Sequence, residues 1–330
     1  EFAVLVAGVT VRKLFVTGTA SPDEILATAR EASYRYHPEL AAQPEKARFY
    51  RGSEIEIVNE PAGERRITHA VFDNDGTIST LRQGWEEVME PVMIRSILGE
   101  GWQEFDESVY QKVAEQVRDY IDKTTGIQTL AQMAGLAKMV REFGYVPEDK
   151  ILDEHGYKKI YNRGLLERVG KRLEKIRTGE LDPADFTVEG AVCFLRELRR
   201  RGVKLYLASG TDQEDVVREA GILGYAGLFE TRIYGALGVI EHEPKRKVLE
   251  SILADISLGQ GEQLVTFGDG PVEIRETRKR NGLTVGVASD EVRRCGLNAA
   301  KRSRLIQAGA DLLIPDFSQT EKLLELLFPA

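Results

Sequence analysis

After residue 185 the sequence alternates between short apolar segments and amphipathic helical segments, and no other feature constrains the fold as strongly. Near-continuous apolar strands separated by helices are typical of a parallel sheet that is covered on both faces. The sequence therefore predicts an α/β fold with a Rossmann-like, doubly wound parallel sheet. The predicted strands span residues 203–208, 264–268, 283–287 and 311–314, and the predicted helices span 188–200, 214–220, 245–255 and 318–327.

An earlier β-prone segment, THAVFDNDGT at residues 68–77, ends abruptly at two carboxylates. Residues two apart in a strand point to the same face, so Asp73 and Asp75 are predicted to converge on one pocket. Crowded carboxylates are costly without a cation, and Mg²⁺ prefers oxygen ligands. A calcium-binding loop needs further oxygen ligands at alternate positions, which this segment does not supply. The motif therefore indicates a metal-dependent phosphoryl-transfer site.

Three later segments supply groups that such a site needs. The strand predicted at 203–208 stops at Ser209, whose hydroxyl is followed by the backbone N–H groups of Gly210 and Thr211. A predicted helix begins with lysines at 245 and 247, and the strand at 264–268 is followed by Asp269. Ligands of open α/β sheets bind beyond the carboxyl ends of the strands, so these groups are expected to meet there. A helix cap at Ser209, a solvated lysine face and a plain turn at Asp269 are the structural alternatives.

Order and chemistry of these motifs resemble the haloacid dehalogenase superfamily. Its members carry a DxDGT motif, a Ser or Thr at a strand end, a Lys, and an acidic turn of the GDxxxD type. The resemblance covers roughly residues 66–330. It favours Lys245 over Lys247 as the catalytic lysine, and it places Glu273 where the superfamily usually has a second aspartate.

The resemblance also implies a role for each residue. Asp73 would be the nucleophile that forms an aspartyl-phosphate, and Asp75 would be the general acid and base. Ser209 and Lys245 would hold the phosphoryl oxygens. Mg²⁺ would be bound by Asp73, by a backbone carbonyl at Asp75 and by Asp269, with Glu273 as a further ligand through water.

Residues 84–183 show helical periodicity with few strands, and the resemblance implies that they form a mobile helical cap inserted into the core. The core would then comprise residues 66–83 and 184–330. A polar break at 124–128 resembles the specificity loop of related caps. The residues expected to contact substrate are Gln83, Trp85, Thr125, Gln128, Gly210 and Thr211.

Residues 1–65 lie outside this pattern and are interpreted as an N-terminal extension and linker, with one possible strand at 54–58. The segment VTVRKLFVTGTASPDEIL at 9–26 resembles the C-terminal end of a ribokinase-like (PfkB) sugar kinase, without that family's catalytic motif. An ordinary extension that packs on the core is the alternative. Because the sequence begins at Glu1 and not at Met, we expect a fragment of a longer protein, fused to a sugar kinase.

Composition excludes several other classes. A net charge of −8 argues against unselective nucleic-acid binding, and no apolar run reaches the length of a membrane span. Two cysteines, Cys193 and Cys295, imply no disulfide framework, so a cytoplasmic protein is expected. Lys301, Arg302 and Arg304 are interpreted as a solvated helix face.

The sequence thus predicts a Mg²⁺-dependent phosphatase that acts on a small phosphorylated metabolite, with a sugar phosphate favoured. A cap that closes over the site should exclude large substrates. A phosphomutase of the same superfamily is the first alternative, because it would keep both acids and the cap. A non-catalytic phosphosugar sensor for a fused kinase is the second.

Overall fold

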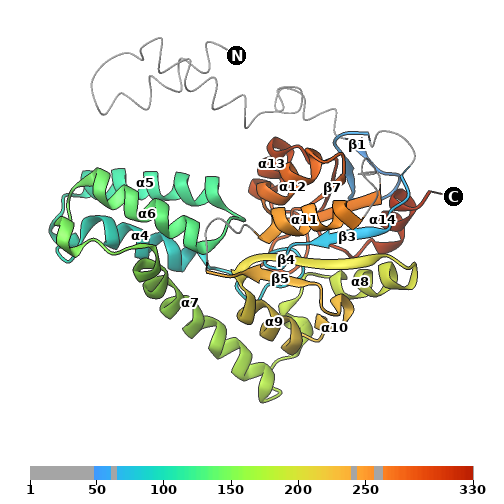
Figure 1. The fold of residues 1–330 in the computed structure, drawn as a ribbon, viewed down its shortest axis with the longest axis horizontal. Helices are drawn as coiled ribbons and strands as arrows, with labels where there is room; N and C mark the ends of the chain where they lie inside the picture. Colours follow the sequence, from blue (N-terminus) through green and yellow to red (C-terminus); the bar gives the residue numbers. More distant parts are fainter. Residues whose placement is uncertain (1–47, 61–64, 239–243, 256–262, 330) are drawn as a thin grey trace, which may run out of the picture.

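The computed structural model of this chain describes residues 48–60, 65–238, 244–255 and 263–329. Within these residues, a sheet of eight strands in the order β1-β2-β8-β7-β6-β3-β4-β5 is flanked by helices, and a separate group of helices projects from one end of it (Figure 1). Strands β3 to β8 pair in parallel, whereas β1 and β2 add antiparallel strands beside β8. The predicted α/β fold with an inserted helical cap is confirmed.

All the strands predicted in the core are present, and one further strand, β5, escaped prediction. The bounds are β1 Arg48–Phe49, β2 Glu56–Ile57, β3 His69–Phe72, β4 Lys204–Asp212, β5 Ile233–Ala236, β6 Leu264–Gly268, β7 Leu283–Val287 and β8 Leu312–Ile314. Strand β5 includes a glycine and an exposed tyrosine, so it lacks the continuous apolar pattern of the other strands. Residues 48–60, interpreted above as linker with one possible strand at 54–58, contribute β1 and β2 to the sheet, and β2 lies within that possible strand. The segment that resembles a sugar kinase lies outside the described residues.

Strand order places a topological switch point at β3. From β3 the chain continues to β4 and β5 on one side, and it then crosses to build β6, β7 and β8 on the other side. Ligands bind at such switch points, outside the carboxyl ends of the strands. Asp73 directly follows β3 and therefore lies at the position where the topology favours a site.

Alternate residues of the central strands bury their side chains on opposite faces of the sheet. Val71, Tyr206 and Leu264 form one cluster with residues of α11, while Phe72 stacks on Phe267 in another, with ring centroids 4.5 Å apart. Figure 1 shows helices α11 to α13 over one face and α8 to α10 over the other. The bounds are α8 Ala191–Arg200, α9 Gln213–Ile222, α10 Ala226–Phe229, α11 Pro244–Asp255, α12 Pro271–Arg278, α13 Ala299–Ala308 and α14 Thr320–Leu327.

The cap consists of α4 Glu86–Leu98, α5 Glu107–Thr124, α6 Thr129–Phe143 and α7 Glu154–Arg177, inserted between β3 and β4. Short 3₁₀ helices occur at Trp102–Glu104, Glu148–Lys150 and Pro183–Phe186. The buried residues of α7 recur every four positions, at Tyr157, Tyr161, Leu165 and Val169, which directs one stripe of this helix inward. Among the described helices, none combines the length and apolarity that crossing a bilayer demands.

Candidate active site

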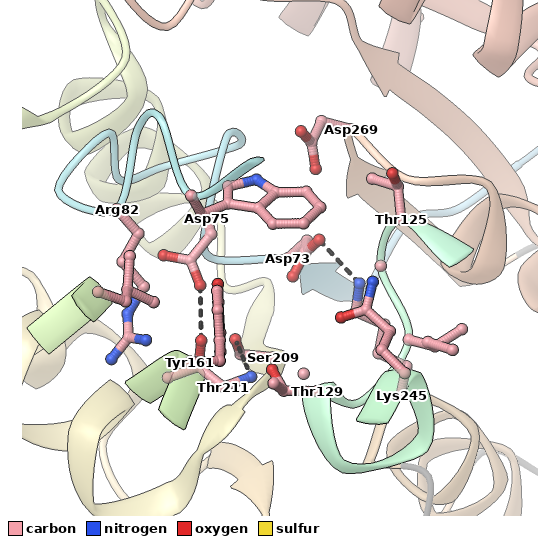
Figure 2. A pocket seen from close by; sticks show the side chains of 16 residues that line it. Asp73, Asp75, Arg82, Thr125, Thr129, Tyr161, Ser209, Thr211, Lys245 and Asp269 are labelled. Atoms are coloured by element: carbon pink, nitrogen blue, oxygen red, sulfur yellow. Dashed lines mark hydrogen bonds and ion pairs between the residues drawn. The ribbon is translucent and has the colours of Figure 1, made fainter. Parts of the chain in front are cut away.

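The carboxyl ends of β3, β4 and β6 face the cap across a cavity of about 90 Å³ (Figure 2). That volume is several times the roughly 10–15 Å³ that a single water needs. From the core, the lining residues include Asp73, Asp75, Ser209, Gly210, Thr211, Lys245 and Asp269. From the cap and the segment leading into it, they include Arg82, Trp85, Thr125, Gly126, Thr129 and Tyr161. The closed cap and the core therefore build the cavity together.

Lys245 bridges two buried carboxylates at the end of the cavity that also carries Thr125. Its Nζ lies 2.8 Å from Asp73 Oδ2 and 2.9 Å from Glu273 Oε2, and all three side chains are buried. Burial lowers the pKa of Lys245, but the two carboxylates outweigh it and hold the pKa above its ordinary value. Lys247 is exposed on the same helix. The structure therefore brings Lys245, and not Lys247, to the predicted nucleophile.

Burial raises the pKa of Asp73 well above its ordinary value, although the neighbouring ammonium of Lys245 opposes the shift. The nearby carboxylates of Glu273 and Asp269 raise it further. Its Oδ1 accepts a hydrogen bond from the backbone N–H of Asn74 at 2.8 Å, which orients the carboxylate. Crowding of this kind is the signature of a site that a cation completes.

Asp75 is held by hydrogen bonds and stands apart from the carboxylates around Lys245. Thr211 Oγ1 donates to Asp75 Oδ2 at 2.8 Å, and Asn74 Nδ2 donates to Oδ1 at 3.1 Å. Burial raises the pKa of Asp75, against the opposing effects of Arg82 and of the Thr211 hydrogen bond. Ser209 Oγ accepts from the backbone N–H of Thr211 at 3.1 Å. Strand β4 therefore positions the Ser209 hydroxyl at the site and, through Thr211, orients the Asp75 carboxylate.

A group of three carboxylates fits a hard divalent cation. Asp73, Asp269 and Glu273 each offer an oxygen, and these oxygens lie within 4.8 Å of one another. Both Glu273 oxygens are already engaged, by the backbone N–H of Gly270 at 2.8 Å and by Lys245. Oxygen-only donors at this spacing suit Mg²⁺. Asp73 and Asp269 are the more accessible ligands, because their side chains are 6% and 10% exposed against 2% for Glu273. The Asp75 carboxylate does not belong to this group.

The loop between α5 and α6 closes over the end of the site that holds Lys245. A Cβ on Gly126 would lie 3.5 Å from Lys245 Nζ and 3.4 Å from Glu273 Oε2. A Cβ on Gly210 would lie 2.8 Å from the carbonyl oxygen of Ile127, closer than real Cβ contacts allow. Thr125 is also in this loop, and its Oγ1 donates to the Ile121 carbonyl at 3.0 Å. Glycine at 210 therefore permits the cap to approach β4.

Two residues that we expected to contact substrate are not brought to the cavity wall. The carbonyl of Gln83 accepts a hydrogen bond from Arg172 at 3.0 Å, and its Oε1 accepts another from Arg172 at 3.2 Å. Gln128 is the N-cap residue of α6, and it is buried without lining the cavity. Of the cap-side residues expected at the site, the structure places Trp85 and Thr125 on the cavity wall.

The interpretation of Lys301, Arg302 and Arg304 as a solvated face is wrong. Lys301 is buried and its Nζ lies 2.8 Å from Asp269 Oδ2 and 2.7 Å from Glu291 Oε1. Arg302 pairs with the buried Glu56 at 2.6 Å. Arg304 pairs across to the cap, with Asp122 at 3.1 Å. These partners come from distant segments, so no local pattern could have indicated them.

Replacing Lys301 by methionine should show whether its ammonium stabilises the protein by neutralising the carboxylates beside the site. The change leaves Asp269 and Glu291 buried without their shared cation, and we expect it to lower the free energy of unfolding in EDTA by about 3 kcal/mol. Mg²⁺ should restore part of this loss, because a divalent ion can neutralise Asp269 in place of the ammonium. Thermal unfolding with and without Mg²⁺ measures both effects.

The adjacent Arg302→Met is the matched control for that measurement. It removes the partner of buried Glu56, which does not belong to the carboxylate group at the site, so it should lower stability by the same amount with Mg²⁺ as with EDTA. If Mg²⁺ rescued both variants equally, or neither, Lys301 would have no specific electrostatic link to the carboxylate group.

Comparison with known proteins gives a consistent result. Residues 67–276 match the family model described as a haloacid dehalogenase-like hydrolase. Similar solved structures include a putative β-phosphoglucomutase from Bacteroides vulgatus (17% identity, 81% of this chain and 92% of that chain, TM-score 0.52). Also similar is a β-phosphoglucomutase from Clostridium difficile (14% identity, 79% of this chain and 97% of that chain, TM-score 0.52). A further similar structure is a predicted phosphoglycolate phosphatase from Haemophilus somnus (16% identity, 79% of this chain and 99% of that chain, TM-score 0.50). These likenesses show the shared fold. No curated protein matches the sequence significantly.

Proposed function

Because this chain belongs to the haloacid dehalogenase-like hydrolases, we propose that it is a Mg²⁺-dependent phosphatase of small phosphorylated metabolites, with sugar phosphates favoured. The observation that carries the proposal is the convergence of Asp73, Lys245 and the carboxylates of Asp269 and Glu273 at the switch point of the sheet. A buried ammonium beside crowded acids suits the binding of a phosphoryl dianion together with a divalent cation.

In the first step, an Asp73 oxygen attacks phosphorus and the bond from phosphorus to the leaving oxygen breaks. Asp75 donates its proton to that oxygen, so the product leaves as a neutral alcohol. The raised pKa of Asp75 suits this role, since the carboxyl must begin protonated. Hydrogen bonds from Asn74 and Thr211 fix its orientation.

In the second step, Asp75 accepts a proton from water, whose oxygen attacks phosphorus and displaces Asp73. Inorganic phosphate forms and Asp73 returns to its carboxylate form. Lys245 and the Ser209 hydroxyl hold phosphoryl oxygens in both steps. Mg²⁺, when bound by Asp73 and Asp269, would neutralise charge on the phosphoryl oxygens.

Closure of the cap supports a small substrate. The loop at 125–127 lies against β4 and the Lys245 pair, so a macromolecular phosphoester could not reach Asp73 in this arrangement. We further propose that the enzyme acts in the cytoplasm, since Cys193 and Cys295 are not joined by a disulfide. Fusion of this chain to a sugar kinase also remains our proposal.

The test is release of inorganic phosphate from a panel of sugar phosphates and other small phosphate monoesters. We expect release that requires Mg²⁺, that stops in EDTA and that returns when Mg²⁺ is restored. Conversion of a sugar 1-phosphate into its 6-phosphate, without net phosphate release, would replace the phosphatase by the phosphomutase. Saturable binding with neither reaction would favour the sensor.

A further inference from the structure

The site also carries information on the part of the substrate that leaves. If Lys245 and Ser209 hold the phosphoryl group and Asp75 protonates the leaving oxygen, the leaving group must extend beyond Asp75. In Figure 2, Arg82, Asp75 and Tyr161 lie on one side of Asp73, opposite Lys245 and Thr125. Tyr161 and Leu165 follow one another on the buried stripe of α7, and the cavity that they line with Arg82 is also lined by Trp85 and Thr129.

Arg82 is the one cationic side chain among the described lining residues on the Asp75 side of Asp73, and it is already paired with carboxylates. Arg82 Nε and Nη2 donate to the two oxygens of Glu219, at 2.9 and 2.6 Å, and Nη2 also contacts Asp215 at 3.2 Å. Glu219 is fully buried. Arg218 shares Asp215 at 2.6 Å, so the group as a whole is balanced. Arg82 therefore brings no uncompensated positive charge to the leaving group.

The remaining side chains suit an alcohol. Among the other residues that line the cavity, Thr129 and Tyr161 offer neutral hydrogen-bonding groups, whereas Trp85 and Leu165 offer apolar surface for C–H groups. Burial raises the pKa of Tyr161, so its phenol stays neutral. A second anion placed here would lose its hydration without gaining a cation, which is costly in a closed cavity.

We propose that the substrate is a phosphate monoester of an uncharged polyhydroxy alcohol, and that phosphorylated acids and bisphosphates are discriminated against. The inference rests on the phosphatase proposed above, because it uses the orientation of the substrate in that reaction. It also disfavours a mutase that works through a bisphosphate, since the second phosphate would have to lie beside the balanced Arg82 group.

Matched substrates that differ only in the charge of the leaving group test the proposal. Glucitol 6-phosphate and 6-phosphogluconate share a six-carbon chain, as do glycerol 3-phosphate and 3-phosphoglycerate with three carbons, and each acid replaces a hydroxymethyl group by a carboxylate. We expect kcat/KM at least tenfold higher for the uncharged member of each pair. Equal values, or a preference for the acid, would overturn the inference and leave the phosphatase intact.

Binding to the Asp73→Asn protein separates the two proposals. Calorimetry with the same four compounds should give a dissociation constant at least tenfold lower for the uncharged members. If the uncharged compounds bind more tightly but the unmodified enzyme hydrolyses none of the four, the phosphatase proposal is wrong and the inference on leaving-group charge stands. Equal affinities, or tighter binding of the acids, would sink the inference whatever the hydrolysis result.

Glu219→Gln provides a gain-of-function arm. It removes one carboxylate from the Arg82 group and leaves an excess positive charge, so the ratio of kcat/KM for acid over alcohol should rise several-fold. A ratio within one protein does not depend on how much of it is folded. Glu197→Gln, which removes a carboxylate of α8 that is paired with Arg200 and Arg201, should leave the ratio unchanged. An unchanged ratio in Glu219→Gln would contradict the charge argument.

Discussion

Asp73→Asn is expected to lower phosphate release by at least about a thousandfold, because an amide cannot act as the nucleophile that opens the covalent route. The substitution keeps the size of the side chain, and Lys245 keeps Glu273 as a partner at 2.9 Å. The folded structure should therefore survive. Single-turnover phosphate release with excess enzyme measures the loss without interference from product release.

The same variant should be more stable than the unmodified enzyme when metal is removed. Burial raises the pKa of Asp73, so its folded form binds a proton more tightly than its unfolded form. The free energy of unfolding therefore falls as pH rises through the range between the two pKa values. Above that range, the folded protein bears the full cost of a buried, ionised Asp73. Asparagine removes that cost.

Thermal unfolding in EDTA should thus show a higher Tm for Asp73→Asn at neutral pH, with a difference that shrinks as the solution is acidified. Mg²⁺ should raise the Tm of the unmodified enzyme more than that of the variant, because only the unmodified enzyme keeps all three carboxylates of the metal site. A lower Tm in EDTA at every pH would mean that the Lys245–Asp73 ion pair outweighs the crowding.

Gly210→Ala is the second large effect that we expect, and it acts on cap closure. The added methyl would lie 2.8 Å from the carbonyl oxygen of Ile127, so the 125–127 loop would have to retreat from β4. A shift of about 1 Å in the groups around a catalytic site can lower the rate roughly 100-fold. We expect kcat/KM to fall by about that factor, with little change in Tm, because the clash is removed when the cap opens.

Gly221→Ala is the matched control, since a Cβ at this position in α9 meets no heavy atom within 4 Å. It should leave kcat/KM unchanged and stabilise the helix slightly. Steady-state kinetics over a substrate series should show the Gly210→Ala loss for every substrate alike. If Gly210→Ala were fully active, catalysis would not require the loop to close against β4.

Much of the site could be predicted because its chemistry is local in sequence. Asp73 and Asp75 follow one apolar strand, Asp269 directly follows another, and Ser209 lies near the carboxyl end of β4, so the fold class alone brings them to one edge. Strands β1 and β5 were not predicted, since short edge strands carry little pattern, whereas β2 lies within the possible strand at 54–58. Helix α4, which contains Pro91, lies within the segment 84–183 that was predicted to be helical.

The sequence by itself determined the doubly wound core, the inserted helices and the main acids, because hydrophobic periodicity and strand ends are encoded by neighbouring residues. Only the tertiary structure decided the charge partners. Lys301 finds Asp269 and Glu291, Arg82 finds Glu219, and Gln83 is held by Arg172 of α7. Those pairings follow from the packing of distant segments, where burial makes an unmatched charge costly, and a one-dimensional pattern cannot show which segments will meet.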